Sequence, residues 1–153
     1  MIVEVAVEDE AWSAVPDLEV LARTAALAAL AGHGQSTVSL LFADDAEVAR
    51  LNSRWRGKSG PTNVLSFPAA PGTARPDGSV PHLGDIVLAA GVVGREAAEQ
   101  GKPMAAHMAH LIVHGVLHLL GFDHGSDRCA GEMEAREIAL LRQLGIADPY
   151  DRN

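Results

Sequence analysis

The chain has 153 residues, of which 48% are hydrophobic and 21% are charged, a composition typical of one globular domain. Its formal net charge of −8 argues against a protein that coats nucleic acid, because phosphate contacts need Lys and Arg, but it is compatible with a local basic groove. No apolar run approaches the roughly 18 residues needed to span a membrane, and the N-terminal segment does not have the pattern of a signal peptide. Cys129 is the only cysteine, so no disulfide can form within the chain, and we expect a cytoplasmic protein.

Strand and helix patterns alternate along the first part of the chain. Apolar–polar alternation predicts strands, and runs of strong helix formers closed by glycine predict helices. By these criteria we expect a strand over 2–8, a helix over 17–31, a strand over 36–42, and a helix that begins at Asp44 or Asp45 and ends near Arg54.

The composition changes between Gly57 and Gly84, where five of the eight prolines lie. Within this segment, residues 63–67 predict a short strand and residues 69–82 an exposed, mobile loop. The remaining elements are expected to be a strand over 84–90 and helices over 92–100, 103–120 and 127–144. About four strands and four to five helices in mixed order predict an α+β fold, a single domain over residues 1–153 with one central mixed sheet.

Five of the seven histidines lie between residues 107 and 124. At about 100° per residue, those on the predicted helix share one stripe about 80° wide, and the rest of this helix is mostly apolar and therefore buried. Any one of them could be a core histidine with a hydrogen-bond partner, but four together favour a functional site. The stripe consists of His107, His110, His114 and His118.

The segment HGVLHLLGFDH, residues 114–124, has the pattern H-G-x-x-H-x-x-G-x-x-H. His114 and His118 stand one helical turn apart, with about 6 Å of axial rise, so both imidazoles can reach one metal ion. Gly121 lets the chain reverse, so that His124 can approach from the other side. Three imidazoles leave a fourth position open, as in catalytic zinc sites, and they predict one zinc ion per chain on a zincin-like metal helix.

Three neighbouring residues have weaker assignments. His110 could support the metal site or face the substrate, whereas packing is the favoured role for His107. Asp123 could orient a ligand imidazole or accept backbone hydrogen bonds in the turn, and the sequence does not decide between the two.

Zinc peptidases called metzincins have nearly the same histidine spacing, but with a glutamate where this chain has Gly115. That glutamate shuttles a proton to the leaving amine, so peptide hydrolysis is disfavoured here. A carboxylate from elsewhere could restore it, and the candidates are Glu96, Glu99 and Asp85. Phosphodiester cleavage has different needs, namely a metal and a fixed cation beside the phosphoryl group.

The segment RWRGKSGPTNVLSFP, residues 54–68, holds the densest group of basic residues. Such a group is often just a solvated helix end, but beside a proline-fixed turn it also suits a phosphate-binding wall. Trp55 could stack on a base. The candidate contacts to RNA are Arg54, Arg56, Lys58, Thr62, Asn63 and Ser66.

The histidine motif, together with RGKSGPTNVLSFP, LGDIVL, EAAEQGKPMAAHMAHLIVHG and the DPY of residues 148–150, resembles the YbeY family of bacterial rRNA-maturation factors. The resemblance covers roughly residues 50–150. It implies a zinc-dependent endoribonuclease that acts on single-stranded RNA, in maturation of the 3′ end of 16S rRNA and in ribosome quality control. It also implies the small ribosomal subunit, and an assembly protein, as partners; we expect no DNA and no membrane.

Carried over residue by residue, the resemblance puts the zinc ligands on His114, His118 and His124 and the functional arginine on Arg56. Asn63 stands where many members have Asp, which puts an acid–base role for this position in question. Two other functions stay open: a non-catalytic ribosome assembly factor with a structural zinc, and a metzincin-like zinc peptidase. The acidic net charge predicts weak intrinsic affinity for RNA, with targeting supplied by the ribosome or by an assembly protein.

Overall fold

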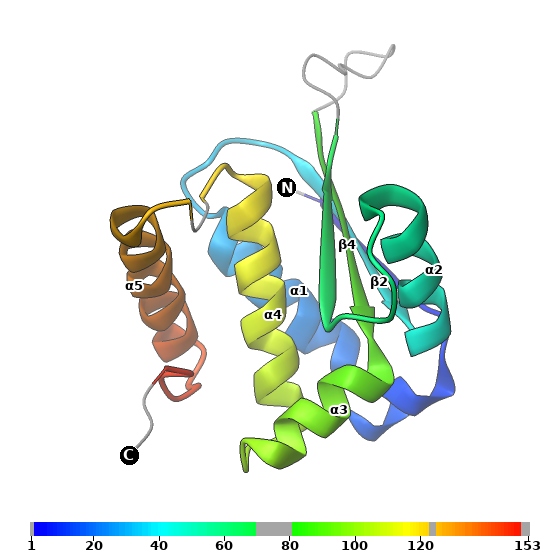
Figure 1. Cartoon of the computed structure of the whole chain (residues 1–153). Helices are drawn as coiled ribbons and strands as arrows, with labels where there is room; N and C mark the ends of the chain where they lie inside the picture. Colours follow the sequence, from blue (N-terminus) through cyan, green and yellow to red (C-terminus); the bar gives the residue numbers. More distant parts are fainter. Residues whose placement is uncertain (1, 70–80, 123–124, 151–153) are drawn as a thin grey trace.

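In the computed structural model, which describes residues 2–69, 81–122 and 125–150, a four-stranded sheet divides the helices into two groups (Figure 1). The strand order is β1-β2-β4-β3, in which the first three strands are parallel and β3 runs antiparallel to β4. The strands are β1 (Ile2–Val7), β2 (Thr37–Ala43), β3 (Val64–Pro68) and β4 (His82–Ala89).

Within the described residues, five α-helices pack around this mixed sheet, so the predicted α+β fold with about four strands and four to five helices is confirmed. Most of the predicted loop over 69–82 lies outside the described residues, and its last residue, His82, already belongs to β4. None of the described helices is long and apolar enough to cross a membrane. The helices are η1 (a 3-10 helix, Glu10–Ala14), α1 (Leu18–Leu30), α2 (Asp45–Arg56), α3 (Ala90–Glu99), α4 (Met104–Leu119) and α5 (Asp127–Gln143).

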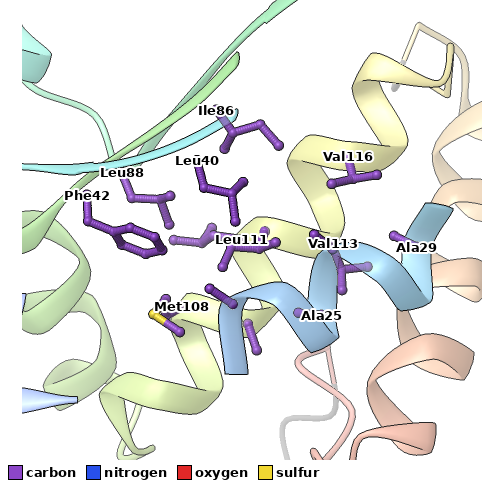
Figure 2. Close-up of a cluster of buried hydrophobic side chains, with 14 of the residues drawn as sticks. Ala25, Ala29, Leu40, Phe42, Ile86, Leu88, Met108, Leu111, Val113 and Val116 are labelled. Atoms are coloured by element: carbon purple, nitrogen blue, oxygen red, sulfur yellow. The ribbon is translucent and has the colours of Figure 1, made fainter. Parts of the chain in front are cut away.

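Alternation along the strands gives the sheet two apolar faces. Ile86 and Leu88 of β4 belong to the larger core, which they share with Met108 of α4 and with α1 (Figure 2). Val87, between them, points to the other face and packs with Val48 of α2. Helices α2 and α4 therefore lie on opposite faces of the sheet (Figure 1).

Candidate metal and RNA site

The predicted histidine stripe is present on α4. The ring centroids of His114 and His118 lie 4.7 Å apart in an edge-to-face arrangement, and both side chains are partly exposed. His110 lies one helical turn before His114, and the centroids of their rings are 6.3 Å apart. His107 is buried and lies a further 6.2 Å along the stripe. The helix thus presents two adjacent imidazoles near its C-terminal end and two more toward its start.

Glu137 of α5, which the sequence analysis did not single out, meets the middle of this stripe. Its side chain is fully buried, and it accepts hydrogen bonds from Nδ1 of His114, from Nε2 of His110 at 3.4 Å and from the hydroxyl of Tyr150. Burial alone would raise the pKa of Glu137, but these three hydrogen bonds outweigh burial and lower the pKa to about 2. Glu137 is therefore an ionised carboxylate inside the protein.

Tyr150 brings the C-terminal segment onto the histidine stripe. Its ring stands edge-on to His110, with the centroids 5.6 Å apart, and its backbone N–H donates to Oδ1 of Asp148 at 2.8 Å. Burial, followed by the Glu137 carboxylate, raises the pKa of Tyr150 well above its ordinary value. Tyr150 therefore stays a neutral hydrogen-bond donor to Glu137.

A second carboxylate, that of Glu96, contacts the histidine stripe at its other end. Oε1 of Glu96, on α3, accepts from Nε2 of His107 at 2.9 Å and from Nδ2 of Asn63 at 3.0 Å. Burial lowers the pKa of His107, although Glu96 acts in the opposite direction. His107 is thus a buried neutral imidazole with a partner, which agrees with the packing role expected for it.

A cavity of about 1040 Å³ runs along the histidine face of α4. It is bounded by the end of α3, by the start of β3 and by the C-terminal segment, and it is large enough for a nucleotide. The predicted site residues that line it are Asn63, His110 and His114. Its other polar lining residues are Glu96, Gln100, Lys102, His107, Asp148 and Tyr150.

Gly115 does not line this cavity; it faces the sheet. A Cβ atom added at Gly115 would lie 3.0 Å from Cδ1 of Ile86 and 3.2 Å from Oγ of Ser66. Ser66 therefore faces α4, but beneath the helix, at the contact with Gly115. The second position of the motif is a packing position in this fold.

The basic residues of the predicted phosphate-binding wall lie away from this cavity. Arg54 and Arg56 are exposed in the last turn of α2, and the guanidinium of Arg54 lies over the ring of Trp55, 5.2 Å from its centroid. Lys58 follows, also exposed, and Thr62 is partly buried. Because α2 and α4 cover opposite faces of the sheet, the structure does not bring these residues into the cavity beside the histidines (Figure 1). A path over the surface between the two groups passes the edge strand β3.

The two predicted zinc ligands that the structure describes, His114 and His118, are placed to fit a zinc ion. His114 donates from Nδ1 to Glu137, which in the neutral imidazole places the lone pair on Nε2, and His118 lies beside it. Gly121, with φ of 102°, ends α4 as predicted, but His124 and Asp123 lie outside the described residues. Within the described part of the chain, no group of three or more His, Cys, Asp or Glu side chains is placed to hold a metal. The three-histidine site thus stays a prediction.

The carboxylates considered for a peptidase lie apart from His114 and His118. Asp85 contacts His82 at 2.9 Å and points to the α2 face of the sheet, and Glu99 is exposed at the end of α3. Glu96 reaches the cavity, but at the His107 end. None of these three carboxylates therefore lies beside His114 and His118, where a peptidase would need it.

The fold and the site together define an α+β domain in which a histidine-bearing helix borders a nucleotide-sized cavity. A family profile described as "Endoribonuclease YbeY" matches residues 7–145. The chain is 50% identical to an Endoribonuclease YbeY from Azorhizobium caulinodans, over 98% of this chain and 96% of the relative. It is 48% identical to another from Dinoroseobacter shibae, over 97% of this chain and 90% of that one. The chain belongs to the YbeY family.

A solved structure supports the fold independently. The solution structure of TM1509 from Thermotoga maritima superimposes with a TM-score of 0.62 at 21% sequence identity. The match covers 98% of this chain and 99% of the other. It shows that the two chains share the same fold over nearly their full lengths.

Proposed function

We propose that this protein is a zinc-dependent endoribonuclease that cleaves single-stranded RNA in the cytoplasm. The observation that carries the proposal is the pair His114–His118, two adjacent, partly exposed imidazoles, the first of which lines the large cavity. Membership of the YbeY family supports the same activity. A zinc ion held by His114, His118 and His124 would supply Lewis-acid polarisation of the scissile phosphodiester.

The chain's own residues would bind and orient the RNA on two surfaces. In the cavity, Asn63 and His110 line the space that a base or ribose would occupy, and Ser66 faces α4 at its contact with Gly115. Outside it, Arg56 would neutralise a phosphate, as the resemblance to the family predicts. Arg54, Lys58 and Thr62 would extend this contact along the strand of RNA.

The separation of these two surfaces favours a polymer as substrate. Around the edge strand β3, a flexible RNA strand can contact the histidine face with one nucleotide and the cations with others. A small molecule in the cavity would reach the histidines alone. We further propose that the RNA is the 3′ end of precursor 16S rRNA on the small ribosomal subunit, in maturation and quality control, with an assembly protein assisting recruitment.

The test is cleavage of a 16S rRNA fragment that carries its unprocessed 3′ extension, with zinc quantified in each preparation. We expect discrete cleavage by the wild type and none by His118→Ala, which also loses zinc. Arg56→Ala should retain zinc and lower turnover by about 100-fold, the cost of losing one group that stabilises transition-state charge. Arg50→Ala, on the same helix but paired with Glu47, is the matched control and should cleave normally.

Equal cleavage by wild type and His118→Ala would mean a contaminating ribonuclease and would favour the non-catalytic assembly factor. Loss of zinc in Arg56→Ala would make Arg56 a structural residue and overturn its assignment to the phosphate.

A further inference from the structure

Glu137 is the only fully buried carboxylate among the described residues, and it has three hydrogen-bond donors from two different parts of the chain. An ionised carboxylate loses several kcal/mol of hydration on burial, so a site of this kind persists only when strong hydrogen bonds replace water. Helix α5 could satisfy its packing with an apolar residue here, as it does with Met133 and Leu141. The carboxylate therefore has a role beyond packing.

Its contact with His114 has a specific chemical consequence. A carboxylate only accepts, so Nδ1 of His114 must carry a hydrogen, and in the neutral imidazole the lone pair then lies on Nε2. A neutral histidine in water favours the opposite tautomer, with the hydrogen on Nε2. A metal ligand that binds through Nε2 needs the tautomer that Glu137 selects.

Tyr150 holds Glu137 in turn. Its hydroxyl donates to Oε2 of Glu137, the same oxygen that accepts from His110, while Oε1 accepts from His114. The turn formed by Asp148 and Pro149 positions Tyr150, whose ring also packs edge-on to His110. The DPY segment thus ends at Tyr150, which donates to the carboxylate that contacts His114 of α4.

We propose that Glu137 is a positioning residue, which fixes the tautomer and orientation of His114 for zinc, and that Tyr150 locks Glu137 in place. This inference rests on the proposed zinc function. It assigns no contact with RNA to either residue, and it gives the C-terminal segment a defined task in assembling the site.

The experiment uses the full chain and two readouts that do not depend on RNA cleavage. Zinc affinity is measured by competition with a chelating dye, and the His114 tautomer is read from imidazole nitrogen spectra of the metal-free protein. In Glu137→Gln we expect zinc affinity to fall by roughly 10- to 100-fold, the usual effect of losing an outer partner of a metal ligand. We also expect His114 to shift toward the Nε2–H tautomer.

Glu132→Gln is the matched control, because Glu132 lies on the same helix with its side chain 60% exposed. It should leave both readouts unchanged. A folded Glu137→Gln protein with wild-type zinc affinity and an unchanged His114 tautomer would overturn the proposal, as would an equal loss of affinity in Glu132→Gln.

Tyr150→Phe provides a second variant that removes one hydroxyl and keeps the ring. We expect a folded protein whose zinc affinity falls severalfold; wild-type affinity would refute the role of Tyr150. Should Glu137→Gln fail to fold, this variant carries the test. A wild type that binds no zinc would contradict the proposed function instead, while the tautomer of the metal-free protein would still test Glu137.

Discussion

At the scale of the residue, Gly115 shows why the histidine motif of this protein differs from that of the zinc peptidases. Position 115 is buried where α4 meets β3 and β4, and an added Cβ would already crowd Ile86 and Ser66. A longer side chain such as glutamate would meet β3 and β4 at this contact. The glycine therefore allows close helix–sheet packing at a position where the zinc peptidases have a glutamate.

Substitutions at Gly115 test this explanation against Gly131, which lies in α5 with open space around it. Gly131→Ala should raise the free energy of unfolding by about 0.5–1 kcal/mol, because alanine favours helix. Gly115→Ala should be less stable than Gly131→Ala by about 1–3 kcal/mol, because the crowding offsets that gain.

Gly115→Glu should lose more than about 3 kcal/mol, because it buries an unpaired carboxylate. Urea unfolding measures all three variants. A Gly115→Glu protein as stable as the wild type would show that position 115 has room for a side chain, contrary to the packing described above.

At the scale of the element, α3 depends on another helix for its start. Its N-cap, Ala89, has no side chain that can accept a hydrogen bond. Asp45, the first residue of α2, takes that role: its Oδ1 accepts from the N–H of Val92 at 3.1 Å, and its Oδ2 accepts from Arg95 at 3.0 Å. Since α3 supplies Glu96 to the cavity, this contact between helices also supports the site.

Asp45→Ala should lower the free energy of unfolding by about 1–2 kcal/mol, the usual loss for a helix cap. Asp45→Asn keeps the acceptor for Val92 and should lose less. Arg95→Ala should lose under about 1 kcal/mol, because the ion pair is mostly exposed. Denaturant unfolding of the three variants checks this order; a larger loss in Arg95→Ala than in Asp45→Ala would show that the ion pair, and not the cap, dominates.

Local patterns predicted most elements to within two residues, because alternation, glycine stops and caps act over a few positions. They missed η1, whose Trp12 is buried and donates to the carbonyl of Ala43, a partner far along the chain. They also missed Glu137, because a carboxylate on a helix is ordinarily exposed, and its partners are brought to it only by tertiary packing. The strand order, too, depends on pairing between distant segments, which periodicity does not encode.

At the scale of the whole molecule, the buried histidine couples stability to pH. Burial lowers the pKa of His107 in the folded protein; Glu96 raises it, while Lys102 and His110 lower it further. The unfolded chain therefore binds a proton near pH 6.5 that the folded chain does not, so stability is fully present above this pH and falls as the pH drops below it.

We expect the wild type to lose up to about 1.4 kcal/mol of unfolding free energy per pH unit from this residue as the pH falls from 6.5 toward 5. His107→Gln, which can still donate to Glu96, should have a flatter profile. Urea unfolding at several pH values measures both; identical slopes would exclude His107 as the source.

The assembly of the site could be predicted only in part. The histidine stripe follows from helical spacing, and it is present as expected. The basic residues near Arg56 looked continuous with Asn63 and Ser66 in the sequence, yet Arg56 ends α2 on one face of the sheet, whereas Asn63 lines the cavity and Ser66 faces α4 on the other. A run of neighbouring residues does not tell which face of a sheet each one reaches once the chain has turned a corner.

The position of β4 has a consequence for how the chain folds as it is synthesised. It is the last strand to be made, yet it occupies an interior place between β2 and β3. Until it emerges, β1 is the only native partner available to β2, and the other edge of β2 stays open to wrong partners. The histidine helix follows β4, and α5 follows that helix. A growing chain therefore completes its sheet first and gains its histidine site only afterwards, when Glu137 has left the ribosome.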